Sequence, residues 1–326
     1  MLAIPSDIRK TAQRVLSSLT GQTCMVGSIN ADLTVETELL PGPGETVAGG
    51  PLQILPGGKS ANQAVAAGKL GAPTAFVGAV GTDPYAPMLR SSLQDAGVNT
   101  RCLLQREGPS GTAVITVDHT GENSIVISPG ANGTLSPADV ESSRSAIEGA
   151  SALGLCLEVA TETVIRAAEI AHDSGTLVVF NLSPVKEIPA ELLSLVDVLI
   201  VNEHELAMLA DCQPAAVTAE RTDTIAAALQ KIGVPQAVVT LGGAGSLAYD
   251  GTELTQIAPF PVKVVDTTGA GDSFMGTLLA ALAADFSLCE GTALASCVSA
   301  LATTKLGAQH SYPTNDEVQE YLSSLQ

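Results

Sequence analysis

Residues 265–282 read VDTTGAGDSFMGTLLAAL, in which a turn of small residues opens a long apolar segment. Gly269, Ala270 and Gly271 are small enough for successive backbone N–H groups to converge on an anion at the start of a predicted helix. Asp272 follows at once, although a carboxylate repels a bound phosphate. It is either an ordinary helix cap or a base that takes a proton from a hydroxyl group attacking the phosphorus. Because a cap needs no preceding Gly-Ala-Gly, the pattern favours the base.

The composition of the 326-residue chain restricts its partners. A formal net charge of −19 argues against nucleic acid, which needs a basic face, so anionic substrates must be held by local backbone amides and a few cations. The chain is 45% hydrophobic but only 3% aromatic, which predicts a core of Ala, Val, Leu and Ile. Six cysteines without a C-x-x-C pair indicate reduced thiols in a cytoplasmic protein. The sequence predicts no zinc site, membrane span or secretory signal.

Apolar strands alternate with amphipathic helices along most of residues 23–326, which we interpret as one domain. This alternation predicts an α/β fold, with a mostly parallel sheet covered by helices on both faces. Two segments, about 33–55 and 111–128, lack helical periodicity and are expected to form a small antiparallel β lid. One apolar face of such a lid needs a partner, so we expect dimerisation through the lid.

Residues 1–22 form an N-terminal extension that is predicted to be helical. One face of that helix would carry apolar residues, namely Ile4, Ile8, Ala12, Val15 or Leu16, and Leu19. A helix packed on the domain is the simpler interpretation, and an arm that contacts a partner is the alternative.

Other polar groups follow predicted strands, at the edge where open α/β sheets hold their ligands. Asn30 and Asp32 in GSINAD suit contacts to sugar hydroxyls, but they also suit an ordinary turn. Asn202 and Glu205 in VNEHE could cap a helix, or could contact hydrated Mg²⁺ or a phosphate. The glycines of TLGGAGS (240–246) could support a nucleotide or simply turn a hairpin.

The stretch GGKSANQA (57–64) contains Gly-Lys-Ser but is not a Walker phosphate-binding loop. Its leading glycine would fall at position 53, which is Gln53. Gly57 and Gly58 could let the backbone approach a ligand before a helix. They could equally form a plain strand-to-helix turn.

Several stretches together resemble the ribokinase-like (PfkB) family of carbohydrate kinases. They match in order and spacing over about residues 23–325, and they are GSINAD, PGPGETV, GGKSANQAVAAGKLGA, GANGTLSP, VNEHE, VDTTGAGDSF and KLGAQHS. The resemblance implies a three-layer α/β/α domain with a β lid and dimers that pair lid to lid. It also implies ATP-dependent phosphorylation of the 5-hydroxyl of D-ribose, which gives D-ribose 5-phosphate.

The resemblance further implies roles for individual residues. Asp272 would be the base, and Gly269, Ala270 and Gly271 would form the anion hole. The residues that match sugar-binding positions are Asn30, Asp32, Gly58, Lys59, Asn62, Glu158 and Asp272. Those that match ATP-binding positions are Asn202, Thr240, Gly242, Gly245 and Gly271, with Glu205 associated with Mg²⁺. A K⁺ ion would be held, mostly by backbone carbonyls, at Asp266, Thr268, Ala302, Lys305, Gly307 and Ser311.

Two alternatives remain open at this point. A related kinase could act on a nucleoside, fructose or deoxyribose, although Asn30-Ala31-Asp32 together with GGKSAN favours free ribose. A sugar- or nucleotide-sensing protein without turnover is the second alternative, and the intact Asp272 and Gly-Ala-Gly turn argue against it. Ser296 stands where these kinases can carry a histidine near the adenine, so contacts to the base also stay open.

Overall fold

The central sheet is built from short strands, and its inner strands bury nearly all their side chains, as parallel strands covered on both faces require. In the computed structural model, which describes residues 6–213 and 217–325, nine strands lie in the order β13-β12-β11-β10-β9-β8-β1-β4-β5. The strands from β11 to β5 run parallel, and β12 and β13 add an antiparallel hairpin at one edge. The strands are β1 (Thr23–Val26), β4 (Thr74–Val80), β5 (Asn99–Gln105), β8 (Ala152–Leu155), β9 (Leu177–Asn181), β10 (Val198–Asn202), β11 (Gln236–Thr240), β12 (Ser246–Tyr249) and β13 (Leu254–Ile257). This confirms the predicted, mostly parallel sheet.

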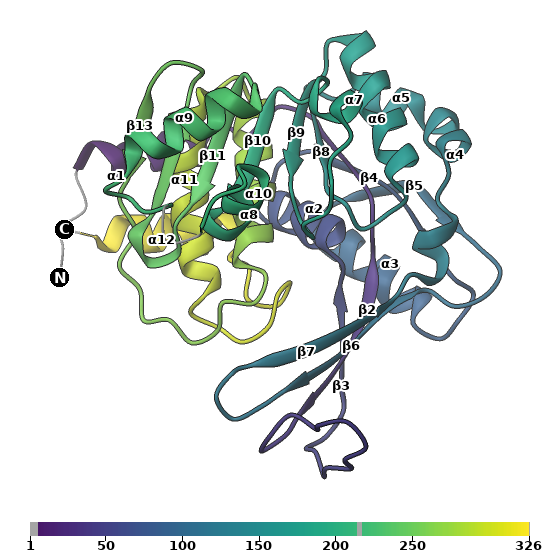
Figure 1. Cartoon of the computed structure of the whole chain (residues 1–326). Coiled ribbons are helices and arrows are strands. Elements are labelled where there is room, and N and C mark those ends of the chain that lie inside the picture. Colours follow the sequence, from purple (N-terminus) through teal and green to yellow (C-terminus); the bar gives the residue numbers. More distant parts are fainter. Residues whose placement is uncertain (1–5, 214–216, 326) are drawn as a thin grey trace.

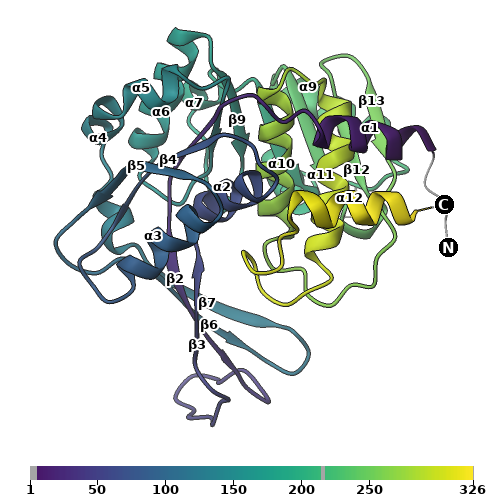
Figure 2. The same ribbon diagram turned by 180° about the vertical axis from the view of Figure 1, so that it is seen from behind.

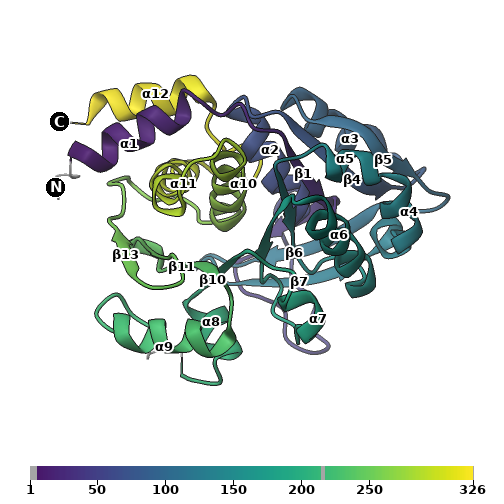
Figure 3. The same ribbon diagram turned by 90° about the horizontal axis from the view of Figure 1, so that it is seen from above.

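Helices cover both faces of the sheet and make three layers, which the view from above separates on the side of β10–β13 (Figure 3). One layer contains α4 (Pro137–Ser142), α5 (Arg144–Glu148), α6 (Thr161–Ser174), α7 (Ala190–Leu193), α8 (Glu203–Leu209) and α9 (Thr222–Ile232). The other contains α2 (Lys59–Lys69), α3 (Ala86–Asp95), α10 (Ala270–Ala283) and α11 (Leu288–Ala302). No helix in the described ranges combines the length and the apolar character that crossing a membrane requires.

A close contact between α2 and α10 positions the site described below. Gly276 lies on α10 where a Cβ atom would come within 2.1 Å of the backbone oxygen of Gln63 on α2. Only glycine allows the two helices to approach this closely. The first turn of α10 is therefore held against the first turn of α2.

The lid is a second sheet that projects from one edge of the body (Figures 1 and 2). Its strands, in the order β3-β2-β6-β7, are β3 (Gln53–Gly57), β2 (Asn30–Glu36), β6 (Gly111–Val117) and β7 (Asn123–Ser128). The pairs β2–β3 and β6–β7 are antiparallel as predicted, but the central pair β2–β6 is parallel. The reason is that β2 and β6 follow β1 and β5, which both point toward this edge.

The boundary between body and lid differs from the prediction. The first lid segment is expected to begin at about residue 33. Instead β1 ends at Val26 and β2 begins at Asn30. Asn30 and Asp32 consequently lie on a lid strand and not in a turn.

The N-terminal segment forms helix α1 (Ser6–Leu16), which packs against α11 and α12 (Asn315–Ser324). Ala12, Val15, Leu16 and Leu19 are buried in this contact, and Ile8 is partly buried. Ile4 lies outside the described residues. The apolar face of the extension is thus covered by the chain's own helices.

Candidate active site

Polar side chains gather where the carboxyl ends of β9, β10 and β11 meet the start of α10. They line a cavity of about 170 Å³. Its lining residues are Lys59, Asn181, Ser183, Ile200, Val201, Asn202, Glu205, Thr240, Gly269, Gly271 and Asp272. The cavity therefore brings together the predicted base, Lys59 and two of the three residues of the predicted anion hole. It also contains Asn202, Thr240 and Glu205, which are predicted to contact ATP or Mg²⁺.

Asp272 is held in place by two side-chain amides from α2. Its side chain is buried, and the residue is only 9% exposed. Asn62 Nδ2 donates to Asp272 Oδ2 at 2.9 Å, and Gln63 Nε2 donates to Asp272 Oδ1 at 3.2 Å. Each carboxylate oxygen thus has a neutral donor, and these two hydrogen bonds satisfy the buried carboxylate although no described residue forms a salt bridge with it.

Asn62 is itself oriented by the C-terminal loop. Gln309 Nε2 donates to Asn62 Oδ1 at 3.0 Å, so the Asn62 NH₂ group faces Asp272. Lys69 Nζ donates to the backbone oxygens of Gln309 at 2.8 Å and Tyr312 at 3.0 Å. This chain of contacts ties the orientation of the candidate base to a loop more than two hundred residues away from α2.

The charges of Asp272 and Lys59 depend on each other. Burial raises the pKa of Asp272, while Lys59 and the Asn62 hydrogen bond oppose that rise. Burial also disfavours the charge of Lys59, but Asp272 and Glu158 outweigh this, so the pKa of Lys59 lies above its ordinary value. Among residues 6–213 and 217–325, Lys59 is the one basic residue that lines the cavity, and it keeps its positive charge at neutral pH.

The Gly-Ala-Gly turn leaves part of its backbone free for a ligand. Gly269 has a φ of 73°, and a Cβ atom there would come within 2.4 Å of the Tyr312 hydroxyl oxygen, so the turn requires glycine. The Ala270 N–H donates to the Thr267 oxygen at 3.1 Å. Beside Gly271 the space is open, because a Cβ atom would meet nothing within 4 Å. Of the three residues, Gly269 and Gly271 therefore line the cavity and Ala270 closes the turn.

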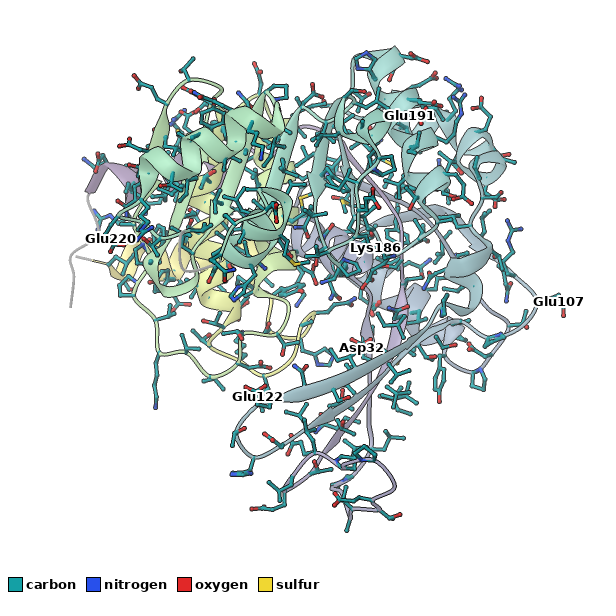
Figure 4. The ribbon with its side chains drawn as sticks, in the orientation of Figure 1. Asp32, Glu107, Glu122, Lys186, Glu191 and Glu220 are labelled. Atoms are coloured by element: carbon teal, nitrogen blue, oxygen red, sulfur yellow. The ribbon has the colours of Figure 1, made fainter. Side chains whose placement is uncertain are left out.

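The predicted sugar-side residues lie beside this cavity, at the root of the lid, where Figure 4 labels Asp32. Glu158 Oε2 accepts from Ser28 Oγ at 2.6 Å and from the Lys59 backbone N–H at 3.0 Å. Burial raises the pKa of Asp32 to about 7, with further contributions from Glu158 and Asp272. Three carboxylates and Lys59 therefore interact in this region.

The two glycines before α2 are explained by the chain's own close packing. A Cβ atom at Gly57 would come within 2.0 Å of an Asp32 carboxylate oxygen. Gly58 has a φ of 89°, and a Cβ atom there would lie 2.8 Å from the backbone N of Asn30. The plain turn is thus sufficient to require both glycines, and that turn also places Asp32 against the start of α2.

Asn202 and Glu205 cap helix α8 and also line the cavity. Asn202 Oδ1 accepts from the Glu205 N–H, and Glu205 Oε2 accepts from the Asn202 N–H, both at 2.8 Å. Burial raises the pKa of Glu205 despite this hydrogen bond. The capping interpretation is therefore correct for both residues, and a ligand contact is compatible with it.

The other residues predicted to bind ATP do not all lie at the cavity. Thr240 lines the cavity, whereas Gly242 and Gly245 do not. Gly245 has a φ of 91°, and a Cβ atom there would come within 2.2 Å of the Ile257 oxygen, so β13 requires this glycine. The Ser296 hydroxyl pairs with that of Ser246 at 3.1 Å.

Two loops predicted to hold a monovalent cation are joined through Asp266. Its carboxylate accepts from the Thr268 N–H at 2.9 Å and from the Gly307 N–H at 2.8 Å. Burial opposes the negative charge, but these hydrogen bonds keep the pKa of Asp266 below its ordinary value. Ser311 Oγ donates to the Ala308 oxygen, and Lys305 Nζ pairs with Glu317 on α12. The oxygens of Ala302, at the end of α11, and of Lys305 and Gly307, in the loop that follows, accept no backbone hydrogen bond from a described residue outside α11.

Sequence reasoning missed several residues of this site. Three side chains donate to predicted site residues, namely Gln63 to Asp272, Gln309 to Asn62 and Asn132 to Asn30. The Asn181 side chain in turn accepts from Gln63. Gln63 and Asn132 fall inside the quoted stretches GGKSANQA and GANGTLSP, so those motifs contained a signal that was not interpreted. Gln309 follows KLGA directly in KLGAQHS.

A second, larger cavity does not coincide with this chemistry. It has a volume of about 430 Å³, lies between β3, α2 and α3, and has a largely apolar lining that includes Leu55, Val65 and Met88. None of the predicted site residues lines it. Volume alone therefore does not identify the active site.

Comparisons with known proteins agree with the geometry. The model of the pfkB family of carbohydrate kinases matches residues 21–315. The chain is 36% identical over 300 residues to the ribokinase of Haemophilus influenzae, covering 91% of this chain and 97% of that protein. It is 38% identical over 299 residues to a bifunctional ribokinase/ribose-5-phosphate isomerase A of Fructilactobacillus sanfranciscensis, covering 90% of this chain but only 55% of the relative.

A solved structure gives the same result for the fold. Ribokinase of Arabidopsis thaliana, complexed with ribose and ATP, superposes with a TM-score of 0.84 at 34% identity and covers 93% of this chain and 99% of that chain. The family match covers the body, the lid and every predicted site residue. The chain therefore belongs to the pfkB family of carbohydrate kinases.

Proposed function

We propose that this protein phosphorylates D-ribose at its 5-hydroxyl, using ATP and releasing ADP. The observation that carries the proposal is the buried Asp272 carboxylate, held by Asn62 and Gln63 in one cavity with Lys59 and Gly271. Relatives named ribokinase support ribose as the acceptor. The sugar would lie at the root of the lid against Asn30, Asp32, Gly58, Lys59, Asn62 and Glu158, and ATP would lie toward Asn202, Thr240, Gly242 and Gly245.

Asp272 would act as the general base. It takes the proton of the 5-hydroxyl as the oxygen attacks the γ-phosphorus, and the proton ends on the carboxylate. Neutral amide donors hold the carboxylate without neutralising it, so it remains able to accept that proton. Burial raises the pKa of Asp272, which makes its carboxylate a stronger base than an exposed one.

The transferring phosphoryl group would be stabilised by the N–H groups at the start of α10 and by Lys59. The amides of Gly269 and Gly271, with Ala270 shaping the turn, form the predicted anion hole. These dipoles are fixed before the reaction, so they stabilise the developing charge with little reorganisation. Lys59 contributes positive charge that a protein of net charge −19 otherwise lacks here.

Mg²⁺ would enter with the ATP phosphates. Among residues 6–213 and 217–325, no cluster of three or more His, Cys, Asp or Glu side chains could hold a metal ion by itself. Mg²⁺ in kinase sites commonly keeps its waters and binds substrate phosphates with one or two carboxylates. The buried Glu205 carboxylate in the cavity fits that pattern.

The two loops joined by Asp266 would hold K⁺. The backbone oxygens of Ala302, Lys305 and Gly307, which have no backbone partner among the described residues outside α11, suit a weakly hydrated monovalent cation. Thr268 and Ser311 lie in the same two loops. The bound ion would supply positive charge beside the anion hole. The proposed compartment is the cytoplasm, where thiols stay reduced, and all six cysteines are free.

An ADP-release assay tests the proposed function directly. Ribose, 2-deoxyribose, fructose and adenosine would each be tested with and without K⁺. We expect turnover on ribose that increases with K⁺. Faster turnover on another acceptor would reassign the sugar-side residues, and binding without any turnover would favour a sensor.

Replacement of the base is the first mechanistic prediction. Asp272→Asn keeps the shape but cannot accept the proton, so kcat should fall by at least about a hundredfold while ATP still binds. Asp223→Asn is the matched control, because Asp223 is an exposed residue in the first turn of α9. Equal turnover by Asp272→Asn and the control would contradict the assignment.

Gly271→Ala tests the anion hole without disturbing the fold. Its methyl group would meet no protein atom but would occupy space assigned to the phosphoryl group. We expect unchanged or slightly higher thermal stability, because alanine favours helix, and kcat/KM for ATP at least about tenfold lower. Gly50→Ala is the control, because its methyl group would meet only the Glu36 oxygen, at an ordinary contact distance of 3.7 Å, and Gly50 does not line the cavity; it should leave kcat/KM unchanged. Normal kinetics in Gly271→Ala would count against the anion hole.

The pKa of Asp32 predicts a pH dependence of ribose binding. Above about pH 7 the ionised Asp32 accepts charge-assisted hydrogen bonds from sugar hydroxyls, and protonation weakens these bonds because one carboxyl oxygen becomes a donor. The KM for ribose should therefore rise as pH falls below about 7, approaching about tenfold per pH unit. The free energy of unfolding of the ligand-free protein should instead be higher at low pH. A carboxyl group whose pKa is raised on folding contributes stability that is lost as pH rises through about 7.

Asp32→Asn provides the comparison for this pH prediction. The substitution should weaken ribose binding far more than ATP binding and should flatten the pH dependence of the ribose KM. Calorimetry at several pH values measures both ligands. An unchanged pH profile in Asp32→Asn would assign the titration to another group.

The lid would pair with a second copy of the chain. Strand register places Leu33, Ile54, Val114 and Val126 on the face opposite Asp32. Val126 is 66% exposed and Val114 is 50% exposed, which is unusual for neighbouring apolar side chains unless a partner covers them. A lid-to-lid homodimer would bury this face.

Val126→Asp tests the proposed dimer. Placing a charge on the apolar face should shift the protein toward monomer in sedimentation velocity, because burying an unpaired charge is costly. Val264→Asp, at an exposed site outside the lid, is the control. A wild-type monomer, or equal dissociation by both variants, would exclude the lid as the interface.

A further inference from the structure

We propose that Asn132 is a positioning residue that determines which hydrogen-bonding group Asn30 presents to the sugar. The inference rests on the proposed function, because it takes Asn30 as a sugar contact. Asn132 lies in the short helix η1 (Gly130–Thr134), directly after the last lid strand, β7. It is 2% exposed, and its side-chain amide is already engaged by Ile29 and Asn30.

The orientation of the Asn132 amide is fixed by the backbone of Ile29. The Ile29 N–H donates to Asn132 Oδ1 at 3.1 Å, and Asn132 Nδ2 donates to the Ile29 oxygen at 3.0 Å. A backbone N–H can only donate, and a backbone oxygen can only accept. The Asn132 NH₂ group therefore has one allowed position, and its second hydrogen bond goes to Asn30 Oδ1 at 2.8 Å.

This contact fixes the orientation of the Asn30 amide, because its Oδ1 end must face Asn132. With Oδ1 occupied by Asn132, the Asn30 NH₂ group remains available as a donor. Asn30 and Asp32 are two apart on β2, so they share one face of the strand. That face offers a donor followed by an acceptor, which suits a sugar oxygen at Asn30 and a sugar hydroxyl hydrogen at Asp32.

Close packing around the pair indicates that the arrangement is specific. Gly111 on β6 is the register partner of Asn30. A Cβ atom at Gly111 would come within 2.0 Å of Asn132 Nδ2 and 2.3 Å of Asn30 Oδ1. Only glycine at position 111 leaves room for the Asn132 and Asn30 side chains to meet beside β6. An amide that is locked in one orientation discriminates between sugars better than one that can rotate.

A double-mutant cycle separates this role from simple support of the lid. The variants are Asn132→Ala, Asn30→Ala and the double variant, and the readouts are sugar KM, ATP affinity and thermal stability. Asn132→Ala should raise the sugar KM about tenfold, equivalent to about 1.4 kcal/mol, with ATP affinity unchanged. In the Asn30→Ala background, the same change should raise the KM no further.

Equal effects of Asn132→Ala with and without Asn30 would overturn the proposal and leave Asn132 a purely structural role. Asn315→Ala is the control, because Asn315 Nδ2 also bonds a backbone oxygen, that of Leu70, and does so away from the cavity. It should lower thermal stability without changing the sugar KM. If Asn132→Ala does not fold, Asn132→Ser replaces it, since a hydroxyl can bond Ile29 but is too short to orient Asn30.

The choice of sugar separates the test of the positioning role of Asn132 from the test of ribose as the substrate. The cycle uses whichever acceptor the wild type phosphorylates fastest, so that a wrong substrate assignment is detected before the cycle begins. If no acceptor is turned over, ribose affinity measured by calorimetry replaces KM. Coupling between Asn132 and Asn30 with a sugar other than ribose would support the positioning role and reject ribose as the substrate.

Discussion

The site depends on burying one carboxylate, Asp272, in a protein of net charge −19 while keeping it able to accept a proton. Desolvation of a carboxylate is costly unless hydrogen bonds or opposite charge compensate. Here the amides of Asn62 and Gln63 satisfy the two oxygens, and Lys59 supplies the nearby positive charge. These contacts exist because Gly276 lets α10 lie directly against α2. The chemistry of the site is therefore a consequence of one close helix contact.

The topology links the lid to the same site. The carboxyl ends of the parallel strands meet at one edge of the sheet, where α/β proteins hold their ligands. The lid strands β2 and β6 start at this edge, and β2 carries Asn30 and Asp32 at its beginning. A sugar bound there would contact both lid and body. Movement of the lid would consequently change the sugar contacts before it changed those to Asp272.

The sequence was sufficient to predict the parallel sheet, the lid segments and the gathering of Asp272, Lys59, Asn202 and Glu205 at one cavity. It could not indicate that Gln309 orients Asn62 or that Asn132 orients Asn30, because these partners are 247 and 102 residues apart and meet only in the folded chain. The start of β2 at Asn30 was missed because the buried run 23–31 continues across the break between two strands. Gly57 and Gly58 suggested a ligand, although the chain's own packing is enough to require them.

The most direct test of the central claim is the phosphorus NMR spectrum of the product formed from ribose and ATP. Transfer to the 5-hydroxyl places the phosphate next to a CH₂ group, so its resonance should be split by two protons on the neighbouring carbon. That pattern is the result predicted by a base at Asp272 acting on the primary hydroxyl. Splitting by a single proton would place the phosphate on a secondary or anomeric oxygen, and the absence of a phosphomonoester signal would contradict phosphoryl transfer to ribose.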